Sequence, residues 1–331
     1  MLRSLIKLAR PTQWSKSVFV LVGPAYHVAD MSPAPSPEDI WWDLGLPAFL
    51  AAAIFALVSS AGYIINDIRD VDRDRAHPRK KNRPIASGAI SVGQAMVYAA
   101  VLLVVAGAMV FALDPAVRIL VALSVLAYFV NVSLYSYKFK RVVITDVMCL
   151  ALGFVIRVIG GCAAVPGVSP SSWILICTFF LAMFLAFGKR LGERRVMADQ
   201  AATARVVQTA YTDDLLRMLV VVTGVGVLLT YALYIAEQEH KYMHGFNLLL
   251  LTLIPATYGL MRCLVLLERG EYDDPTELAV HDRPFQAAAA LFALITLILV
   301  LVFHQGRLGD SVDQGAGGVV GFDRVVEIAQ R

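Results

Sequence analysis

Three aspartates at the end of an apolar stretch are the residues in this sequence best suited to chemistry. Asp67, Asp70 and Asp74 are spaced i, i+3 and i+7, which places them on one face of a helix about one turn apart. Like charges in this arrangement repel one another, and the negative end of the helix dipole adds to the cost. The pattern therefore indicates a bound cation. A set of oxygen ligands without His or Cys favours Mg²⁺ or Mn²⁺ over zinc.

A cationic loop follows the aspartates. The segment from His77 to Pro84 includes Lys80 and Arg83. A carboxylate–metal helix beside a basic loop suits a substrate with several phosphates, because the metal holds one group and the basic side chains hold the others. The simpler interpretations are a solvated charge run next to a membrane and a basic loop that only orients the chain in that membrane.

The elements that must position these residues are predicted to be membrane helices. Of the 331 residues, 58% are hydrophobic and only 17% are charged, against about 25% charged in an ordinary soluble domain. A globule of this size cannot bury so many apolar side chains, which excludes a soluble enzyme. Runs of about 20 apolar residues, the length that spans a bilayer, predict an all-α, polytopic membrane protein with nine transmembrane helices at residues 14–29, 46–66, 92–113, 117–136, 143–164, 172–188, 216–236, 246–267 and 285–304.

Basic residues are distributed unevenly between the two ends of these segments. The N-terminal stretch and the loops after the second, fourth, sixth and eighth segments hold most of the 29 Lys and Arg. By the positive-inside rule, these regions are cytoplasmic. A signal peptide is the alternative for the first segment, but no small-residue cleavage site follows it. We expect residues 1–305 to form one transmembrane domain with cytoplasmic catalytic loops, and the Gly-rich residues 306–331 to form a mobile tail.

Arg157 lies inside the fifth apolar segment. A charge at this depth is costly and usually faces the interior of the bundle, where it has a partner. We therefore predict that Arg157 either binds a substrate phosphate or pairs with a carboxylate such as Asp146. Asp282 and Arg283 precede the ninth segment, and a helix N-cap is the alternative role for Asp282.

The acidic helix end resembles the first aspartate-rich motif of the UbiA superfamily of intramembrane prenyltransferases. That motif reads NDxxDxxxD and corresponds here to residues 66–74. Members that act on aromatic substrates carry a second acidic motif, DxxxD, after a later helix. The matching region of this chain, residues 187–194, is basic instead and contains Lys189, Arg190 and Glu193. The difference is chemically large. Two acidic motifs bind a prenyl diphosphate through metals, whereas one acidic and one basic motif indicate different phosphate groups.

One acidic and one basic motif resemble the decaprenyl-phosphate phosphoribosyltransferase branch of the superfamily. The similar stretches extend over residues 10–286, nearly the whole chain. They are RPTQWSK at 10–16, DRAHP at 74–78, RPIASG at 83–88, RVIGG at 157–161, GKR at 188–190 and DPTELAVHDR at 274–283. Ser17 departs from the pattern, because we expect Asn after the lysine, and this leaves the polar contacts near the N-terminal helix open.

The resemblance implies a fold, a reaction and a set of site residues. The fold is a UbiA-like bundle, and the reaction transfers 5-phosphoribose from phosphoribosyl diphosphate (PRPP) to a decaprenyl-type polyprenyl phosphate, releasing diphosphate, for cell-envelope precursor synthesis. Asp67, Asp70 and Asp74 would be the catalytic metal ligands for Mg²⁺ or Mn²⁺. The substrate-binding candidates are Asn66, Lys16, Lys80, Arg83, Lys140, Arg157, Lys189, Arg190, Glu193, Asp282 and Arg283.

The same resemblance sets the expected surroundings of the reaction. The partners are PRPP, the polyprenyl phosphate and the bilayer of the cell membrane, with the active site on its cytoplasmic side. Nucleic acid is not an expected partner, and a homo-oligomer stays open. The long isoprenoid tail of the acceptor predicts a lateral opening between helices into the lipid.

Three other functions compete with this one. A UbiA-type aromatic prenyltransferase using a polyprenyl diphosphate is the main alternative, and the missing second DxxxD argues against it. A transporter would place polar groups near the midplane and often carries internal repeats, whereas the charge clusters here lie at one end of the segments. A CDP-alcohol phosphotransferase also uses aspartates on membrane helices, but its Gly-containing acidic signature is absent from the sequence.

Overall fold

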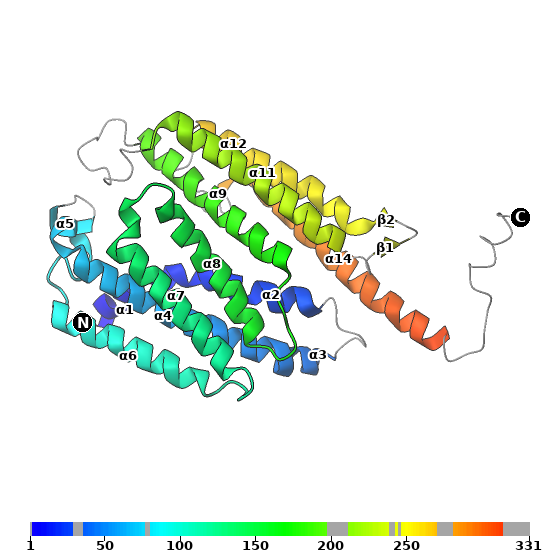
Figure 1. Ribbon diagram of the computed structural model, residues 1–331, viewed down its shortest axis with the longest axis horizontal. Coiled ribbons are helices and arrows are strands. Elements are labelled where there is room, and N and C mark those ends of the chain that lie inside the picture. The colour runs from blue at the N-terminus through cyan, green and yellow to red at the C-terminus, as the bar shows by residue number, and fades with distance from the viewer. Residues whose placement is uncertain are drawn as a thin grey trace, which may run out of the picture.

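The structure, a computed structural model, describes residues 2–28, 36–76, 80–196, 211–237, 242–243, 246–269 and 281–313. Within these ranges the chain is an elongated bundle of helices (Figure 1), which confirms the all-α class. The long helices are α4 (Leu46–Arg69), α6 (Val92–Val110), α7 (Arg118–Tyr137), α8 (Thr145–Ala163), α9 (Ser172–Val196), α11 (Asp213–Glu237), α12 (Leu253–Arg269) and α14 (Arg283–Asp313).

Short elements connect and cap these helices. They are α1 (Leu2–Ala9), the 3₁₀ helix η1 (Pro11–Ser17), α2 (Val18–Val28), α3 (Pro37–Asp39), the π-helix η2 (Ile40–Gly45), α5 (Val71–Ala76) and the 3₁₀ helices η3 (Lys80–Asn82), η4 (Phe139–Arg141) and η8 (Leu248–Thr252). Two-residue strands, β1 (Tyr242–Met243) and β2 (Phe246–Asn247), pair antiparallel, with Tyr242 opposite Asn247. They form the one sheet in the described part of the chain.

Seven helical segments of the described chain are long and apolar enough to cross a membrane. They are Ile40–Arg69, Val92–Val110, Arg118–Tyr137, Thr145–Ala163, Ser172–Gly192, Asp213–Glu237 and Leu248–Arg269. A shorter apolar segment, Arg283–Leu299, begins α14. The first predicted segment divides into η1 and the 11-residue α2, which contains Pro24. A polytopic bundle is therefore confirmed, whereas the count of nine is not.

The outward faces of the bundle fit a lipid environment. Large apolar side chains on α6 and α7 are exposed, among them Val104 (72% exposed), Leu120 and Leu123. Contiguous exposed apolar surface of this kind marks contact with a membrane or a partner. Helix α14 continues to Asp313, so it extends past the boundary at residue 306 that we predicted for the tail, and residues 314–331 lie outside the described residues.

The interior consists of separate apolar clusters. One joins α8, α9, α11 and α12 around Phe184, Phe187 and Leu266. A second joins α4, α6 and α7 around Phe55 and Val121. A smaller cluster packs α1 and the loop before α6 against the end of α4. Burial of these apolar groups fixes the helix ends, and thereby the polar side chains that the ends carry.

Helix α2 lies against α8 at a glycine. A Cβ atom on Gly161 would lie 1.7 Å from the carbonyl oxygen of Val20, so no other residue fits unless α2 moves away. We expect Gly161→Ala to destabilise the protein by about 1–3 kcal/mol, as overpacked cores do. Gly107→Ala in α6 is the matched control, because no atom lies within 4 Å of its added Cβ and alanine favours the helix. Thermal unfolding in detergent compares the two, and equal midpoints would contradict this contact.

Candidate active site

The predicted acidic residues lie where α4 ends, at the left end of the bundle in Figure 1. The α-helix is interrupted at Asp70, whose backbone has φ −96° and ψ 8°, and α5 begins at the next residue. Asp67 therefore belongs to α4 and Asp74 to α5. The single helical face predicted for the three carboxylates is not formed, because the chain leaves regular helical geometry between them.

Asp67 and Asp74 converge on one arginine. Nη1 of Arg83 donates to Oδ1 of Asp67 at 3.0 Å and to Oδ2 of Asp74 at 2.7 Å. Both aspartates are almost fully buried. The backbone N–H of Arg83 donates to the carbonyl of Lys80, and its carbonyl accepts from the backbone N–H of Ser87. The predicted basic loop thus brings its arginine to the acidic helix end.

A second arginine, which the sequence analysis did not select, also binds Asp67. Nη2 of Arg10 donates to both oxygens of Asp67, at 2.6 and 2.7 Å, and its guanidinium lies over the ring of Tyr63. Arg10 has left-handed backbone geometry, with φ 53°, and immediately precedes Pro11. Such strain in a non-glycine residue is costly and concentrates at functional sites.

Asp70 has a different cationic partner. Nζ of Lys140, from η4, donates to the two oxygens of Asp70 at 2.8 and 2.9 Å and to Oδ1 of Asn66 at 3.2 Å. The structure thus brings together Asn66, Asp67, Asp70, Asp74, Arg83 and Lys140, all predicted from the sequence, and adds Arg10. Three carboxylates meet three cations, so the cluster is close to neutral.

The fit of this cluster to a metal can be judged from its donor set. Among the described residues, no three His, Cys, Asp or Glu side chains are gathered as they would be around one metal ion. Asp67 and Asp74, however, direct one oxygen each at the same cationic nitrogen. Mg²⁺ is usually held by one or two carboxylates and completes its shell with water and phosphate oxygens. The pair therefore fits such an ion better than the predicted set of three does.

Arg157 is buried in the middle of α8, as its position in an apolar segment predicts. Its Nη2 donates to the hydroxyls of Ser59 and Tyr128 at 2.8 and 2.6 Å, and its Nη1 donates to the carbonyl of Gly153. No contact with a carboxylate occurs in the described chain. The alternative of a pair with Asp146 is therefore wrong, since both residues belong to α8, 11 positions and about 16 Å apart.

Asp146 pairs instead with Arg190, near the end of α9. Nη2 of Arg190 lies 2.5 Å from Oδ2 of Asp146, and both side chains are buried. Oδ1 of Asp146 accepts a hydrogen bond from the hydroxyl of Tyr211 at 2.8 Å. Arg190 was predicted to bind substrate, whereas the structure turns it toward the interior. Neither Asp146 nor Tyr211 was among the predicted site residues.

Five other predicted residues lie near the same ends of the helices. Lys16 in η1 and Lys80 at the start of η3 are half-buried, and Lys189 in α9 and Arg283 at the start of α14 are exposed. Glu193 belongs to α9, but its side chain lies outside the described part of the structure. Of the cationic loop, residues 77–79 also lie outside the described ranges.

Asp282 caps α14 and pairs with Arg262. Its Oδ1 accepts from the backbone N–H of Phe285 at 2.8 Å, and its two oxygens accept from the guanidinium of Arg262 at 3.2 and 2.9 Å. The N-cap alternative is thereby confirmed. The hydrogen bond from Arg262 lowers the pKa of Asp282 below its usual value of 3.8.

The lowered pKa of Asp282 predicts a pH-dependent contribution to stability. A carboxyl whose pKa is lower in the folded state stabilises the protein above its unfolded pKa, and this contribution is lost as the pH falls through the folded value. We expect Asp282→Asn, which still caps the helix, to lower the thermal midpoint at pH 6. The difference from the unmodified protein should shrink below about pH 4. If the difference in thermal midpoint did not depend on pH, the contact with Arg262 would not act through the negative charge of Asp282.

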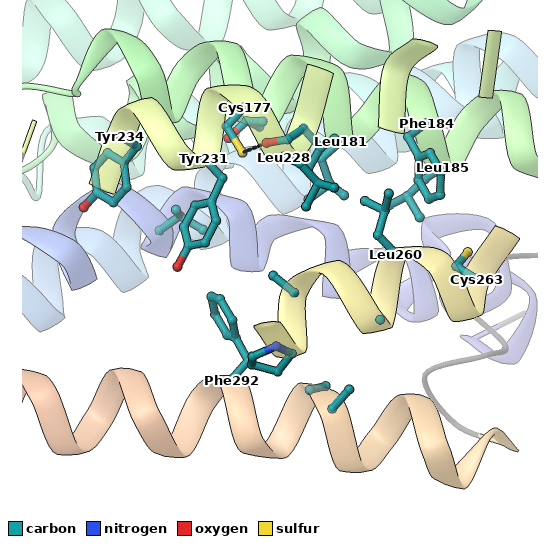
Figure 2. A pocket seen from close by; sticks show the side chains of 18 of the residues that line it. Cys177, Leu181, Phe184, Leu185, Leu228, Tyr231, Tyr234, Leu260, Cys263 and Phe292 are labelled. Atoms are coloured by element: carbon teal, nitrogen blue, oxygen red, sulfur yellow. Dashed lines mark hydrogen bonds between the residues drawn. The ribbon is translucent and has the colours of Figure 1, made fainter. Parts of the chain in front are cut away.

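A large apolar cavity lies deeper in the bundle. It has a volume of about 450 Å³ and is lined by residues of α2, α9, α11, α12 and α14. Figure 2 shows Leu181, Tyr231, Leu260 and Phe292 around it. Phe19, another lining residue, packs edge-on against the ring of Phe154, which in turn contacts the guanidinium of Arg157. The cavity can hold an apolar chain, and the side chains of Phe19 and Phe154 lie between it and the buried arginine.

Comparison with known proteins relates this geometry to a family. The model of the UbiA prenyltransferase family matches residues 21–280. The decaprenyl-phosphate phosphoribosyltransferase of Mycolicibacterium smegmatis is 30% identical over 289 residues, covering 85% of this chain and 87% of that protein. The enzyme of the same name from Corynebacterium glutamicum is 28% identical over 300 residues, covering 90% of this chain and 87% of its own.

Solved structures agree with the fold. A UbiA homolog from Archaeoglobus fulgidus bound to DMAPP and Mg²⁺ superposes with a TM-score of 0.64 at 20% identity, covering 90% of this chain and 99% of the homolog. A digeranylgeranylglyceryl phosphate synthase structure gives a TM-score of 0.55 at 17% identity, covering 93% and 99%. Together with the seven long apolar helices and the family match over most of the sequence, they identify a multi-pass membrane transferase. The chain belongs to the UbiA prenyltransferase family.

Proposed function

We propose that this protein transfers 5-phosphoribose from PRPP to a polyprenyl phosphate and releases diphosphate. The observation that carries the proposal is that two buried carboxylates, Asp67 and Asp74, point at the same cationic nitrogen. The basic side chains of this cluster are Arg10, Arg83 and Lys140. Carboxylates that can take a metal beside cations that can take phosphates match a donor with a diphosphate and a further phosphate. The names of the relatives at about 30% identity support the same reaction.

The leaving diphosphate is the group that the acidic end of α4 would serve. Asp67 and Asp74 would hold Mg²⁺, with Asp70 at the helix interruption between them. When bound, the metal supplies positive charge that neutralises the diphosphate as its bond to C1 of the ribose breaks. Arg10, Arg83 and Lys140 add fixed positive charge at the same place.

The acceptor needs little activation. Its phosphate is already an anion, so no strong general base is required. The protein must instead hold two anionic reactants close together and reduce their repulsion. Lys189, exposed at the end of α9, and Lys16 on η1 are placed to contribute, and the basic character of the α9 end replaces a second acidic motif.

The apolar cavity is the proposed binding site of the isoprenoid tail. Its lining is almost entirely aliphatic and aromatic, which suits a hydrocarbon chain and offers nothing to a phosphate. Arg157, which Phe19 and Phe154 separate from the cavity, is proposed to attract a substrate phosphate, since a buried guanidinium with no carboxylate partner among the described residues favours an anion. By the positive-inside rule we place the phosphate site on the cytoplasmic face of the cell membrane.

The reaction is tested with purified protein in lipid vesicles, ribose-labelled PRPP, decaprenyl phosphate and Mg²⁺. We expect label to move into the organic phase and to require both substrates and the metal. An equal amount of organic-phase label without decaprenyl phosphate would indicate transfer to a lipid that copurifies with the protein, because hydrolysis of PRPP leaves the label in the aqueous phase. Absence of lipid-linked label, together with prenylation of an aromatic acid from a polyprenyl diphosphate, would refute the proposal in favour of the aromatic prenyltransferase alternative.

A further inference from the structure

We infer that Tyr211, Asp146 and Arg190 form a buried positioning cluster that fixes Lys140 in the active site. This inference rests on the proposed function, in which Lys140 faces phosphate. None of the three residues is placed to touch substrate: Asp146 and Tyr211 are 0% exposed and Arg190 is 4% exposed. Their role follows from a strained segment of backbone between Lys140 and α8.

Ile144 is the strained residue. It has φ 67° and ψ −49°, and among the described residues it and Arg10 are the only non-glycine residues with positive φ. Such a conformation is a true outlier for a β-branched side chain. Strain of this kind persists only where surrounding contacts enforce it. Arg10 also belongs to the acidic cluster, so both outliers lie next to residues of the proposed site.

The contact that enforces the strain comes from Tyr211. The backbone N–H of Ile144 donates to the hydroxyl of Tyr211 at 2.6 Å, and that hydroxyl donates to Asp146 at 2.8 Å. Burial strongly raises the pKa of Tyr211, so the hydroxyl keeps the proton that it donates. The one hydroxyl oxygen therefore satisfies both the amide of Ile144 and the buried carboxylate of Asp146, which lie 67 and 65 positions before Tyr211 in the sequence.

Arg190 connects this contact to the end of α9. Its guanidinium pairs with Asp146 at 2.5 Å with both groups buried. A buried ion pair is often no more stabilising than an apolar contact of the same shape, so its presence here indicates that it sets geometry. The pair joins the start of α8 to the turn of α9 that carries Lys189, the residue next to Arg190.

The strained segment leads directly to Lys140. Lys140 belongs to η4, four residues before Ile144, and its ammonium group holds Asp70 and Asn66. Backbone hydrogen bonds link the intervening segment, since the N–H of Val142 donates to the carbonyl of Phe139 and the N–H of Thr145 donates to the carbonyl of Val143. A shift of Ile144 toward relaxed geometry would therefore move Lys140 away from the acidic cluster.

Tyr211→Phe removes only the hydroxyl and tests the connection. We expect the KM for PRPP to rise about tenfold while kcat changes less than about twofold, because binding geometry is lost and the chemistry is not. In a protein that already carries Lys140→Gln, the same substitution should add no further increase in KM. Independent, multiplicative effects of the two substitutions would overturn the inference.

A second measurement needs no substrate. Hydrogen exchange of the backbone amides of residues 138–145 should become faster in Tyr211→Phe, whereas exchange in α6 should not change. Ser124→Ala is the matched control, because the buried hydroxyl of Ser124 donates within its own helix, to the carbonyl of Val121, and this substitution should leave both exchange and KM unchanged. Unchanged exchange in residues 138–145 would refute the positioning role whatever the reaction is. Failure of the phosphoribose transfer itself would instead appear as inactive unmodified protein.

Discussion

Replacing Asp67 with Asn is expected to abolish phosphoribose transfer and to remove Mn²⁺ binding, with a rate at least about 100-fold lower. Asp67 is the most heavily paired carboxylate of the cluster, since it accepts bonds from both Arg10 and Arg83. Asparagine keeps the volume and loses the charge that a metal requires. The rate is measured with labelled PRPP, and metal binding by Mn²⁺ spectroscopy on the substrate-free protein.

Asp72→Asn is the matched control for Asp67. Asp72 lies in α5 within the same sequence motif, but its side chain is 91% exposed, and its partner among the described residues is Arg75, three residues on. An exposed pair of this kind contributes little, so this variant should behave like the unmodified protein. Transfer and Mn²⁺ binding retained in Asp67→Asn would remove Asp67 from the metal site.

Arg83→Gln is expected to change the affinities for metal and donor in opposite directions. Arg83 occupies the position between Asp67 and Asp74 that the metal would share. Without its charge, Mn²⁺ alone should bind about tenfold more tightly, because a competing cation has gone. PRPP should bind about tenfold more weakly, because a charge-assisted bond to phosphate has gone. Calorimetric titration of each ligand in turn measures both effects.

Arg75→Gln controls for loss of positive charge at the surface, since Arg75 is largely exposed and bonds Asp72 and the carbonyl of Ala86. It should change neither affinity by more than about twofold. Arg83→Lys keeps the charge but has fewer N–H donors and a different shape, and its affinities for Mn²⁺ and PRPP should fall between those of the unmodified protein and Arg83→Gln. If Arg83→Gln bound both Mn²⁺ and PRPP more weakly, Arg83 would not compete with the metal for Asp67 and Asp74. Its role would then be purely structural.

The helices were largely predictable from hydropathy. Segments predicted at 46–66, 117–136 and 143–164 correspond to α4, α7 and α8 with ends within a few residues, because the bilayer imposes length and polarity on each span. The first segment was harder to predict. Its residues form η1 and a short α2, and composition alone cannot distinguish an interrupted helix from a continuous one.

The site was only partly predictable. Spacing selected Asp67, Asp70 and Asp74, and the basic loop selected Arg83; the structure brings these side chains together with their cationic partners, and their role in the reaction stays a prediction. Their grouping was wrong, since the interruption at Asp70 depends on tertiary contacts that no local pattern records. Arg10 and Tyr211 were missed because their partners lie 57 and 65 positions away. An arginine directly before a proline, ahead of a membrane segment, was the available signal for Arg10.

The pairing of Arg190 with Asp146 could not be predicted from a sequence pattern either. Lys189 and Arg190 are adjacent, and a basic motif treats them alike, yet the helix turns the first to the surface and the second into the core. Neighbouring residues on a helix differ by about 100° in direction, so only one of them can face the phosphate site. Knowledge of which face α9 buries, against α8 and α11, was needed to assign the two roles.

Mass spectrometry of the lipid product tests the central claim most directly. Purified protein in vesicles is given both donor and acceptor pairs at once: PRPP with decaprenyl phosphate, and a polyprenyl diphosphate with an aromatic acid. We predict one Mg²⁺-dependent product with the mass of decaprenyl phosphate extended by a 5-phosphoribosyl group, absent from Asp67→Asn. A prenylated aromatic acid, without any phosphoribosylated lipid, would contradict the assignment.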